Sequence, residues 1–317
     1  MNKLKNALGK QKIEVIGAVM LLAICVLPFL TFASSRKGIY VDASAKGSEN
    51  GSASSPYHTI SKALDNADDR IDIHVAKGEY RENITIEKGI QVFGSAAGDV
   101  VIRPASKNKP VVTMKHNTEI NKVTIEKGDD GVLVREDAKA SIIEVVIKNN
   151  TGDGVKIEKG DVKDKFRVSI SDSTIIDNGG SGIFSQKRRL SIINNDVVNN
   201  GKDGIDLYGG TSAWMEKNSI RNNDKSGLKL TLDGSEIWTK NNTIKGNSGQ
   251  GVEVNAWGGV GRIDLNKSKI TDNKKFAVAR NARVSFGASI WNGLTVQKNT
   301  DFKDNKSGNI SGINLLR

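Results

Sequence analysis

The chain has 317 residues, a formal net charge of +11, 33 glycines and only 5% aromatic residues. Its single cysteine, Cys25, excludes a disulfide framework and a cysteine-rich zinc site. The basic residues are scattered among 36 acidic ones and no nucleic-acid-binding motif is present, so nucleic acid is not an expected partner. The positive balance indicates either an acidic partner, such as an anionic polysaccharide or lipid, or simply a basic soluble surface.

The N-terminal segment is predicted to anchor the chain in a membrane. Residues 1–14 are rich in lysine and are expected to form a cytoplasmic tail. Residues 15–33 contain an uncharged apolar run that is just long enough to span a bilayer as a helix. We therefore expect a signal-anchor over residues 15–33, a short linker over 34–38, and a single-pass protein whose domain lies outside, at the cell surface or in the periplasm. Cleavage of the segment as a signal peptide is the alternative, and would make the protein secreted.

The next region is expected to combine short strands with one helix. Ile60, Ala63, Leu64 and Ala67 recur at helical spacing and form one apolar stripe, in a helix that begins near Ser55. This stripe must cover an apolar surface, so the helix is predicted to cap the open end of a solenoid core. Strands are expected at residues 39–41, 71–75, 84–86, 90–93 and 100–102.

One short pattern recurs seven times within residues 145–310, an Asn followed five residues later by an apolar residue. A constant internal spacing with a variable interval is typical of a solenoid whose turns share one corner and tolerate insertions elsewhere. At that corner the Asn is expected to adopt left-handed backbone geometry and to bond the amides of neighbouring turns in a ladder. The seven are Asn150, Asn178, Asn200, Asn223, Asn247, Asn273 and Asn305; Asn195, Asn218 and Asn242 indicate a second ladder.

Apolar and polar residues alternate around each repeated Asn, which predicts short strands with one face on a core. Successive units should stack in parallel about 4.8 Å apart and give roughly nine to eleven coils. The polar positions then form outward rows. One row places Trp214 beside Trp238, and another places Lys229 between Asp206 and Glu253. Three further residues follow that second row: Tyr208, Asn255 and Trp257.

These features resemble a known family. The segments SSPYHTISKAL, KGEYRENITI and GIQVFG, within residues 39–103, are similar to the N-terminal turn and cap of pectin-lyase-like right-handed parallel β-helix proteins, and the repeats of residues 120–310 are similar to their coils. The resemblance implies an all-β fold, a single-stranded right-handed parallel β-helix over residues 39–317. It implies no particular activity, because the family includes lyases, hydrolases, epimerases, phage tailspikes and non-enzymatic surface proteins.

The outward rows contain the candidate sites. Exposed indoles at Trp214 and Trp238 would either pack under a loop or bind the flat apolar face of a sugar ring. Asp206 and Glu253, two turns and about 10 Å apart, approach the separation of an inverting pair of catalytic carboxylates. A charge ladder through Lys229 that stabilises the sheet is the simpler interpretation of that row.

Enzyme motifs of the resembled family are largely missing. The Gly-His-Gly and Arg-Ile-Lys motifs of polygalacturonase-like members and the Asp-Pro-His-Glu motif of alginate epimerases do not occur. Asp129, Asp130 and Asp153 could hold Ca²⁺, but their Gly-Asp-Gly context is also ordinary turn sequence. We therefore predict no metal and no other cofactor.

The sequence thus predicts a membrane-anchored β-helix that binds or displays glycans without catalysis, with an acidic polysaccharide as the first ligand to test. Tyr208, Asn255 and Trp257 would join the two tryptophans in binding. A lyase or glycoside hydrolase that uses Asp206, Lys229 and Glu253 is the first alternative. A purely structural protein that self-associates through its C-terminal coil is the second, because no helix is expected to cover that end.

Overall fold

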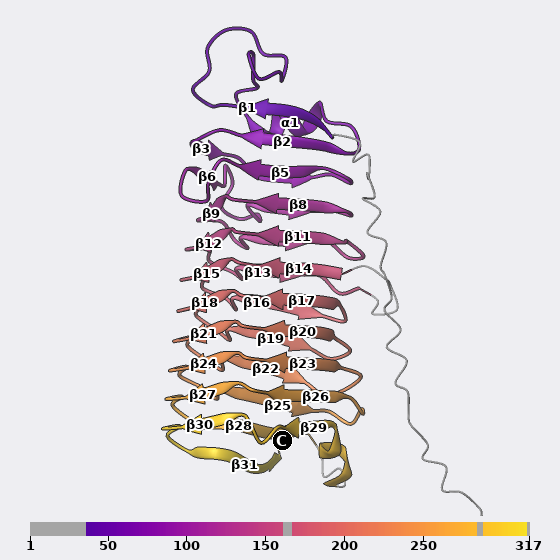
Figure 1. Cartoon of the computed structure of the whole chain (residues 1–317), viewed down its shortest axis with the longest axis vertical. Helices are drawn as coiled ribbons and strands as arrows, with labels where there is room; N and C mark the ends of the chain where they lie inside the picture. Colours follow the sequence, from indigo (N-terminus) through magenta and orange to yellow (C-terminus); the bar gives the residue numbers. More distant parts are fainter. Residues whose placement is uncertain (1–35, 161–166, 284–287, 316–317) are drawn as a thin grey trace, which may run out of the picture. The chain divides into compact units, whose positions relative to one another are not determined.

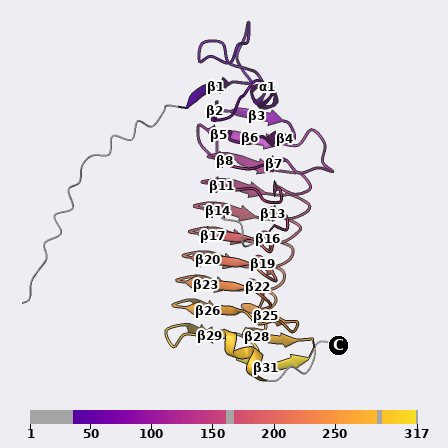
Figure 2. The ribbon, with the colours of Figure 1, turned by 90° about the vertical axis from the view of Figure 1, so that its right-hand side faces the viewer.

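Three parallel β-sheets wind around one core in the computed structural model, which describes residues 36–160, 167–283 and 288–315 (Figure 1). Each pass of the chain adds one strand to each sheet in turn, and the strands stack in sequence order (Figures 1 and 2). The predicted all-β parallel solenoid is therefore confirmed. In the described residues the three sheets hold 11, 10 and 10 strands.

We name the sheets A, B and C in the order in which the chain enters them. Sheet A contains β1 (Lys37–Val41), β2 (Ile71–Val75), β5 (Gln91–Gly94), β8 (Thr118–Asn121), β11 (Ala140–Ile143), β14 (Arg167–Ser171), β17 (Arg189–Ile193), β20 (Ser212–Glu216), β23 (Glu236–Lys240), β26 (Arg262–Asn266) and β29 (Leu294–Val296). Sheet B contains β3 (Gly78–Arg81), β6 (Val100–Arg103), β9 (Thr124–Glu126), β12 (Val146–Lys148), β15 (Thr174–Ile176), β18 (Asp196–Val198), β21 (Ser219–Arg221), β24 (Thr243–Lys245), β27 (Lys269–Thr271) and β30 (Asp301–Lys303). Sheet C contains β4 (Ile84–Ile86), β7 (Val112–Met114), β10 (Val132–Val134), β13 (Val155–Ile157), β16 (Ile183–Gln186), β19 (Ile205–Tyr208), β22 (Leu228–Thr231), β25 (Val252–Ala256), β28 (Phe276–Ala282) and β31 (Gly308–Leu315). The helices of the described residues are α1 (Ile60–Asp65) and a 3₁₀ helix, η1 (Ala288–Gly293).

The core consists of aliphatic residues that stack turn upon turn. Ile183, Ile205 and Leu228 are register partners on adjacent strands of sheet C, and all three are fully buried. Alternate residues of each strand point outward, as the period-two pattern predicts. The repeated apolar positions therefore fix the register, and the residues between them form the outer faces.

The predicted amide ladder lies at the corner between sheets B and C. The Nδ2 group of Asn178 donates to Oδ1 of Asn200 at 3.0 Å, and Asn200 donates in the same way to Asn223. Equivalent bonds link the other members, and Asn195, Asn218 and Asn242 form the second ladder at the corner between sheets A and B. These side chains are buried, so each hydrogen bond also satisfies a polar group that water cannot reach.

One detail of the corner differs from the prediction. The residue in left-handed geometry is the one before each ladder Asn, such as Asp177 with φ 54° before Asn178 or Asn199 with φ 53° before Asn200. Asp177 and Asn199 are exposed, and the positive φ turns the chain so that the next side chain points into the ladder. The ladder Asn thus contributes its side-chain amide, and the residue before it contributes the positive φ of the turn.

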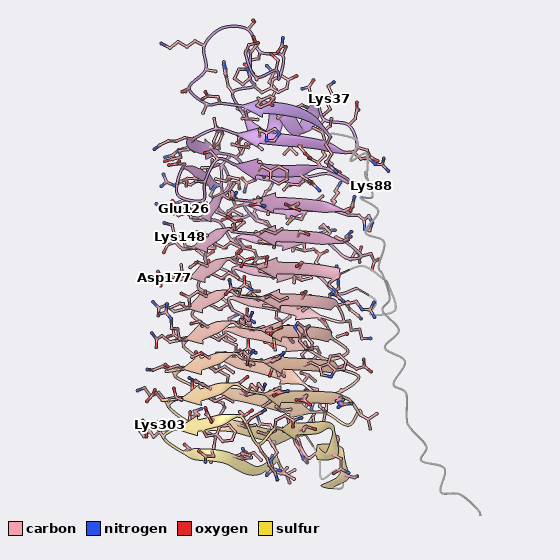
Figure 3. All side chains as sticks on the ribbon, viewed as in Figure 1. Lys37, Lys88, Glu126, Lys148, Asp177 and Lys303 are labelled. Atoms are coloured by element: carbon pink, nitrogen blue, oxygen red, sulfur yellow. The ribbon has the colours of Figure 1, made fainter. Side chains whose placement is uncertain are left out.

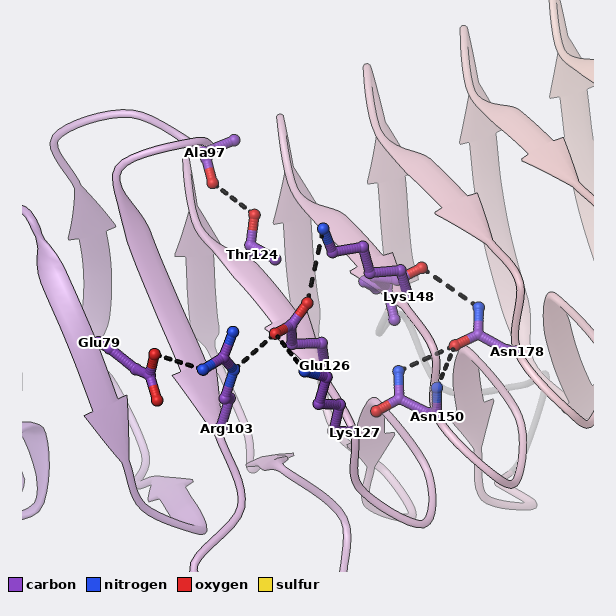
Figure 4. A network of polar contacts seen from close by, with 10 residues as sticks. Glu79, Ala97, Arg103, Thr124, Glu126, Lys127, Lys148, Asn150 and Asn178 are labelled. Atoms are coloured by element: carbon purple, nitrogen blue, oxygen red, sulfur yellow. Dashed lines mark hydrogen bonds and ion pairs between the residues drawn. The ribbon is translucent and has the colours of Figure 1, made fainter.

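On the outer face of sheet B, acidic and basic side chains of neighbouring strands form ion pairs (Figures 3 and 4). Arg103 lies between Glu79 and Glu126, with its Nε 2.6 Å from Oε1 of Glu126, and Lys148 Nζ lies 3.5 Å from Oε2 of the same carboxylate. Burial raises the pKa of Glu126, but Arg103 and Lys148 outweigh it and hold that pKa below its usual value. These charges stabilise neighbouring strands of the sheet.

The predicted helix exists but is shorter than expected. Thr59 is its N-cap, with Oγ1 accepting from the Lys62 amide at 3.2 Å, and the Glu82 carboxylate accepts from the Ile60 amide at 2.9 Å. Ile60, Ala63 and Leu64 are buried, and α1 contacts β1, β2 and β4, the first strands of sheets A and C. Its role as a cap on the core stays a prediction.

The localisation as a single-pass membrane protein is corrected. In residues 36–160, 167–283 and 288–315 no helix is long and apolar enough to cross a bilayer. The helix α1 has six residues, or about 9 Å at 1.5 Å per residue, against a hydrocarbon core of about 30 Å. The predicted tail, residues 1–14, and the predicted anchor, residues 15–33, lie outside the described part of the chain.

Candidate functional site

Two tryptophans lie side by side on the outer face of sheet A. Trp214 of β20 and Trp238 of β23 are register partners, as the spacing predicted, and Ser191 and Asp264 flank them on the adjacent strands. Trp214 is 39% exposed and Trp238 is half-buried. The indole Nε1 of Trp214 donates to Oε2 of Glu216 at 3.2 Å. Burial of Trp214 beneath a loop is thereby excluded, and its ring remains open to a ligand.

The charged row on sheet C also has the predicted register. Asp206 of β19 pairs with Lys229 of β22, which pairs with Glu253 of β25. The contacts, however, do not run evenly along the row. Lys229 Nζ lies 3.1 Å from Asp206 Oδ2 and 3.9 Å from Asp203 Oδ2. Glu253 instead accepts at Oε2 from the Ser226 hydroxyl at 2.9 Å. The row is therefore a cluster centred on Lys229 and not an alternating ladder.

Asp203 is a member of this cluster that the sequence interpretation missed. It is buried, and its Oδ1 accepts from the Ser226 amide at 2.9 Å. Asp130 and Asp153 occupy the same turn position in earlier coils and accept from the amides of Asp153 and Ser181. The signal was an acid two residues before the first apolar residue of a sheet C strand.

The cluster holds more negative than positive charge. Burial raises the pKa of Asp203 and of Asp206 above the usual value, and the other carboxylates add to this effect. Burial lowers the pKa of Lys229, but Asp206, Asp203 and Glu253 outweigh it and leave that pKa raised. Burial is thus the main cause of the raised carboxyl pKa values, and the three carboxylates around one ammonium group are the cause of the raised pKa of Lys229. In the described part of the chain, Oδ1 of Asp206 is buried and has no hydrogen-bond partner.

A polar cavity of about 340 Å³ opens beside this cluster. Asp203, Ser226, Lys229 and Glu253 line one side of it, and Gln250 and Lys275 are also among its lining residues. Asp206 is not among the residues that line it. The wall of the cavity offers both hydrogen-bond donors and carboxylate acceptors, which suits a hydroxylated or charged ligand.

The three residues predicted to extend the site have different environments. Tyr208 is 43% exposed on the outer face of sheet C. Asn255 is buried and donates to Glu253 at 3.3 Å, so it supports that carboxylate instead of facing a ligand. Trp257 is half-buried, and the Arg283 guanidinium lies 5.9 Å from its ring centroid. Of the three, Tyr208 has the most exposed side chain.

Two of the three acids considered for Ca²⁺, Asp130 and Asp153, are bonded to protein groups. Asp130 accepts from the Asp153 amide at 2.9 Å and lies 3.3 Å from Lys156 Nζ, and Asp153 accepts from the Ser181 amide at 2.7 Å. Burial raises the pKa of Asp153. Throughout the described ranges, no group of three or more His, Cys, Asp or Glu side chains is arranged to hold a metal ion.

Solved structures with this fold come from several kinds of protein. The A-module of the mannuronan C-5 epimerase AlgE4 of Azotobacter vinelandii has a TM-score of 0.55 and 17% identity, over 87% of this chain and 98% of that one. An alginate lyase from Paenibacillus sp. has a TM-score of 0.60 and 16% identity, over 80% and 96%. The pectate lyase Pel9A has a TM-score of 0.55 and 15% identity, over 88% and 78%. At these identities the likeness shows the fold alone.

No curated protein matches the chain in sequence. The family model described as "Right handed beta helix region" matches residues 130–307, which is more than half of the 317 residues. The matched segment includes both amide ladders, the tryptophan pair and the Lys229 cluster. The chain therefore belongs to the right-handed β-helix family.

Proposed function

We propose that this protein binds a polysaccharide on the outer face of sheet A and does not cleave it. The observation that carries the proposal is the Trp214–Trp238 pair, two indoles on neighbouring turns of which one is 39% exposed. Large exposed rings on a rigid sheet are costly unless a ligand covers them, and a sugar ring presents a flat apolar face of matching size. The strand spacing of about 4.8 Å also places the two indoles close enough for one oligosaccharide to contact both.

Two further facts support a glycan as ligand. The structurally similar proteins include an alginate lyase, a pectate lyase and a mannuronan epimerase, whose names refer to acidic polysaccharides. The chain carries a net charge of +11, which would favour such a ligand over a neutral one at long range. An acidic polysaccharide is therefore the first ligand to test.

The absence of catalysis is proposed from the state of the carboxylates. Glu253 accepts hydrogen bonds from Ser226, Asn255 and Asn281, and Asp206 is paired with Lys229. A general acid or base must reach the proton that it transfers, and these groups are already bonded to protein donors. They would have to leave those partners before they could act on a glycan.

A glycan array with the full chain, followed by a product assay on each ligand found, tests the proposal. We expect binding without release of shorter products or unsaturated ends. Trp214→Ala/Trp238→Ala should weaken binding at least about tenfold, which corresponds to about 1.4 kcal/mol. An acidic polysaccharide that binds the double variant as tightly as the unmodified chain would refute the site.

A polysaccharide lyase or hydrolase at the sheet C cavity is the second candidate. One observation favours it: the raised pKa values of Asp203 and Asp206 beside a cavity of about 340 Å³, with one Asp206 oxygen buried and unbonded among the described residues. Perturbed carboxyls in a cavity are typical of active sites, although ion-pair clusters show them too. Turnover that disappears in Asp206→Asn or Glu253→Gln would establish this function in place of the first.

Self-association through the C-terminal strand is a third candidate. Ile310, Ile313 and Leu315 of β31 are exposed, Leu315 by 58%. β31 is also the last strand of sheet C, so one of its edges has no neighbouring strand in the described residues. Sedimentation of the full chain over a hundredfold concentration range, compared with Ile310→Lys/Ile313→Lys, distinguishes a monomer from an assembly held by this edge.

A further inference from the structure

A second aromatic surface lies at the other end of sheet A. Tyr40, His74 and Phe93 are the outward residues of β1, β2 and β5, and they are register neighbours. The ring centroids of Tyr40 and His74 are 5.1 Å apart and those of His74 and Phe93 are 6.0 Å apart, with interplanar angles of 26° and 23°. Tyr40 is 38% exposed and His74 is also exposed. Three stacked rings thus lie on the first three strands, two of them exposed and Phe93 half-buried.

These rings form one wall of a cavity of about 320 Å³. Ala53 and Pro56, from the loop that follows β1, line it together with Asp42 and Ser95. The lining combines aromatic and aliphatic side chains with polar groups, and such a mixture in a volume of this size is typical of a small-ligand site. The Trp214–Trp238 pair does not line it, and lies five strands beyond Phe93 in the order of sheet A, or about 24 Å.

The charge in this cavity differs from that of the whole chain. Among the lining residues that the structure describes, Asp42 is the one carboxylate and there is no lysine or arginine. The amide and hydroxyl of Ser44 both donate to Oδ1 of Asp42, at 2.8 and 2.7 Å. The side-chain and backbone hydrogen bonds from Ser44 lower the pKa of Asp42, so the carboxylate is ionised at neutral pH. Its Oδ2 remains available to accept from a ligand hydroxyl or ammonium group.

We infer that this cavity binds one pyranose unit that carries no carboxylate, with its apolar face against the Tyr40–His74–Phe93 rings and a hydroxyl or amino group at Asp42. A uronic acid would bring a second negative charge to a lining that, in the described residues, has no lysine or arginine to balance it. The inference rests on the proposed function for the class of ligand, but it concerns a separate site. It predicts that a bound glycan has a neutral or amino-substituted unit at this end, although the chain as a whole is basic.

The test uses the full chain in the Trp214→Ala/Trp238→Ala background, so that only this cavity is measured. Cellotetraose, a glucosamine tetramer and tetragalacturonate are titrated separately by calorimetry. We expect at least one of the first two to bind, and tetragalacturonate to bind at least about tenfold more weakly. Phe93→Ala should weaken the binding about tenfold, and circular dichroism and thermal unfolding verify that this variant folds.

Asp42→Asn provides a matched variant that keeps the Oδ1 acceptor for Ser44 and should leave the fold intact. We expect it to bring the affinity for tetragalacturonate to within about threefold of that for cellotetraose. No binding of any probe, binding unchanged in Phe93→Ala, or equal binding of tetragalacturonate before Asp42 is changed would overturn the inference. If only the Trp214–Trp238 proposal failed, the result would be different: the unmodified chain and the tryptophan variant would bind the acidic polysaccharide equally well.

Discussion

The outer faces of sheets A and C have the same repeated backbone but present different kinds of side chain. On sheet A the candidate site residues are aromatic rings, and Trp214 and Tyr40 are open to solvent. On sheet C, apart from the exposed ring of Tyr208, the candidate residues are those of the Lys229 cluster, which are charged and bonded to each other or to nearby amides and hydroxyls. A group already bonded within the protein contributes to stability, whereas an exposed ring without a covering group is available to a ligand. This difference is why we assign binding to sheet A.

The largest stability effect is expected at the corner that supports both faces. Asn223→Ala removes the amide that donates to Asn247 and to the Val197 carbonyl, and that accepts from Asn200. Buried groups on both neighbours would be left without partners, so we expect a loss on the order of 3 kcal/mol in the free energy of unfolding. Chemical denaturation measures it, with Asn309→Ala at an exposed position as control, expected within about 0.5 kcal/mol of the unmodified chain. Equal effects of the two changes would show that the ladder contributes little.

A smaller loss in the free energy of unfolding is expected when the sheet C cluster loses its lysine. Lys229→Gln leaves Asp203, Asp206 and Glu253 without a compensating charge, at a position that is only partly buried. We expect destabilisation of about 1–2 kcal/mol at pH 7, between the values for exposed and buried pairs. Lys225→Gln, an exposed residue that lines the same cavity, is the matched control and should change stability little. If Lys229→Gln were neutral, the cluster would not be structural, and the enzyme hypothesis would gain support.

The smallest effect concerns pH. Burial raises the pKa of Asp203 from its usual 3.8, so the folded state takes up the proton at a higher pH than the unfolded state. Above the folded-state pKa, ionisation of Asp203 therefore lowers the free energy of unfolding. As the pH falls toward 3.8, Asp203 takes up a proton and the wild-type chain regains that free energy. Asp203→Asn keeps the acceptor for the Ser226 amide and should be more stable at pH 7 by about 0.5 kcal/mol. Thermal unfolding between pH 7 and 4 should show this advantage disappear; an advantage that grows in acid would contradict the assignment.

Most of the frame could be predicted from the sequence because it repeats. Seven Asn, each five residues before an apolar residue, predicted the ladder, and counting from them placed Trp214 beside Trp238 and Asp206 beside Lys229. The backbone at the corner was less accessible, since either of two adjacent polar residues can adopt positive φ. Asp177 adopts the positive φ, and Asn178 joins the ladder because only its side chain points inward.

The function-bearing contacts were harder to predict because they occur once. Nothing in the spacing indicates that Glu253 bonds Ser226 instead of Lys229, since that depends on side-chain rotamers. The stack of Tyr40, His74 and Phe93 was missed although each ring follows a buried aliphatic residue of its strand. Its three strands come before the Asn repeats, so no repeated residue placed them in register.

The most direct test compares the two faces with one ligand. The acidic polysaccharide selected by the array is titrated into the unmodified chain, into Trp214→Ala/Trp238→Ala and into Glu253→Gln. We predict that the tryptophan variant loses at least about tenfold in affinity, while Glu253→Gln stays within about twofold of the unmodified chain. Binding that is retained without the tryptophans but lost in Glu253→Gln would contradict the account and assign the ligand to sheet C.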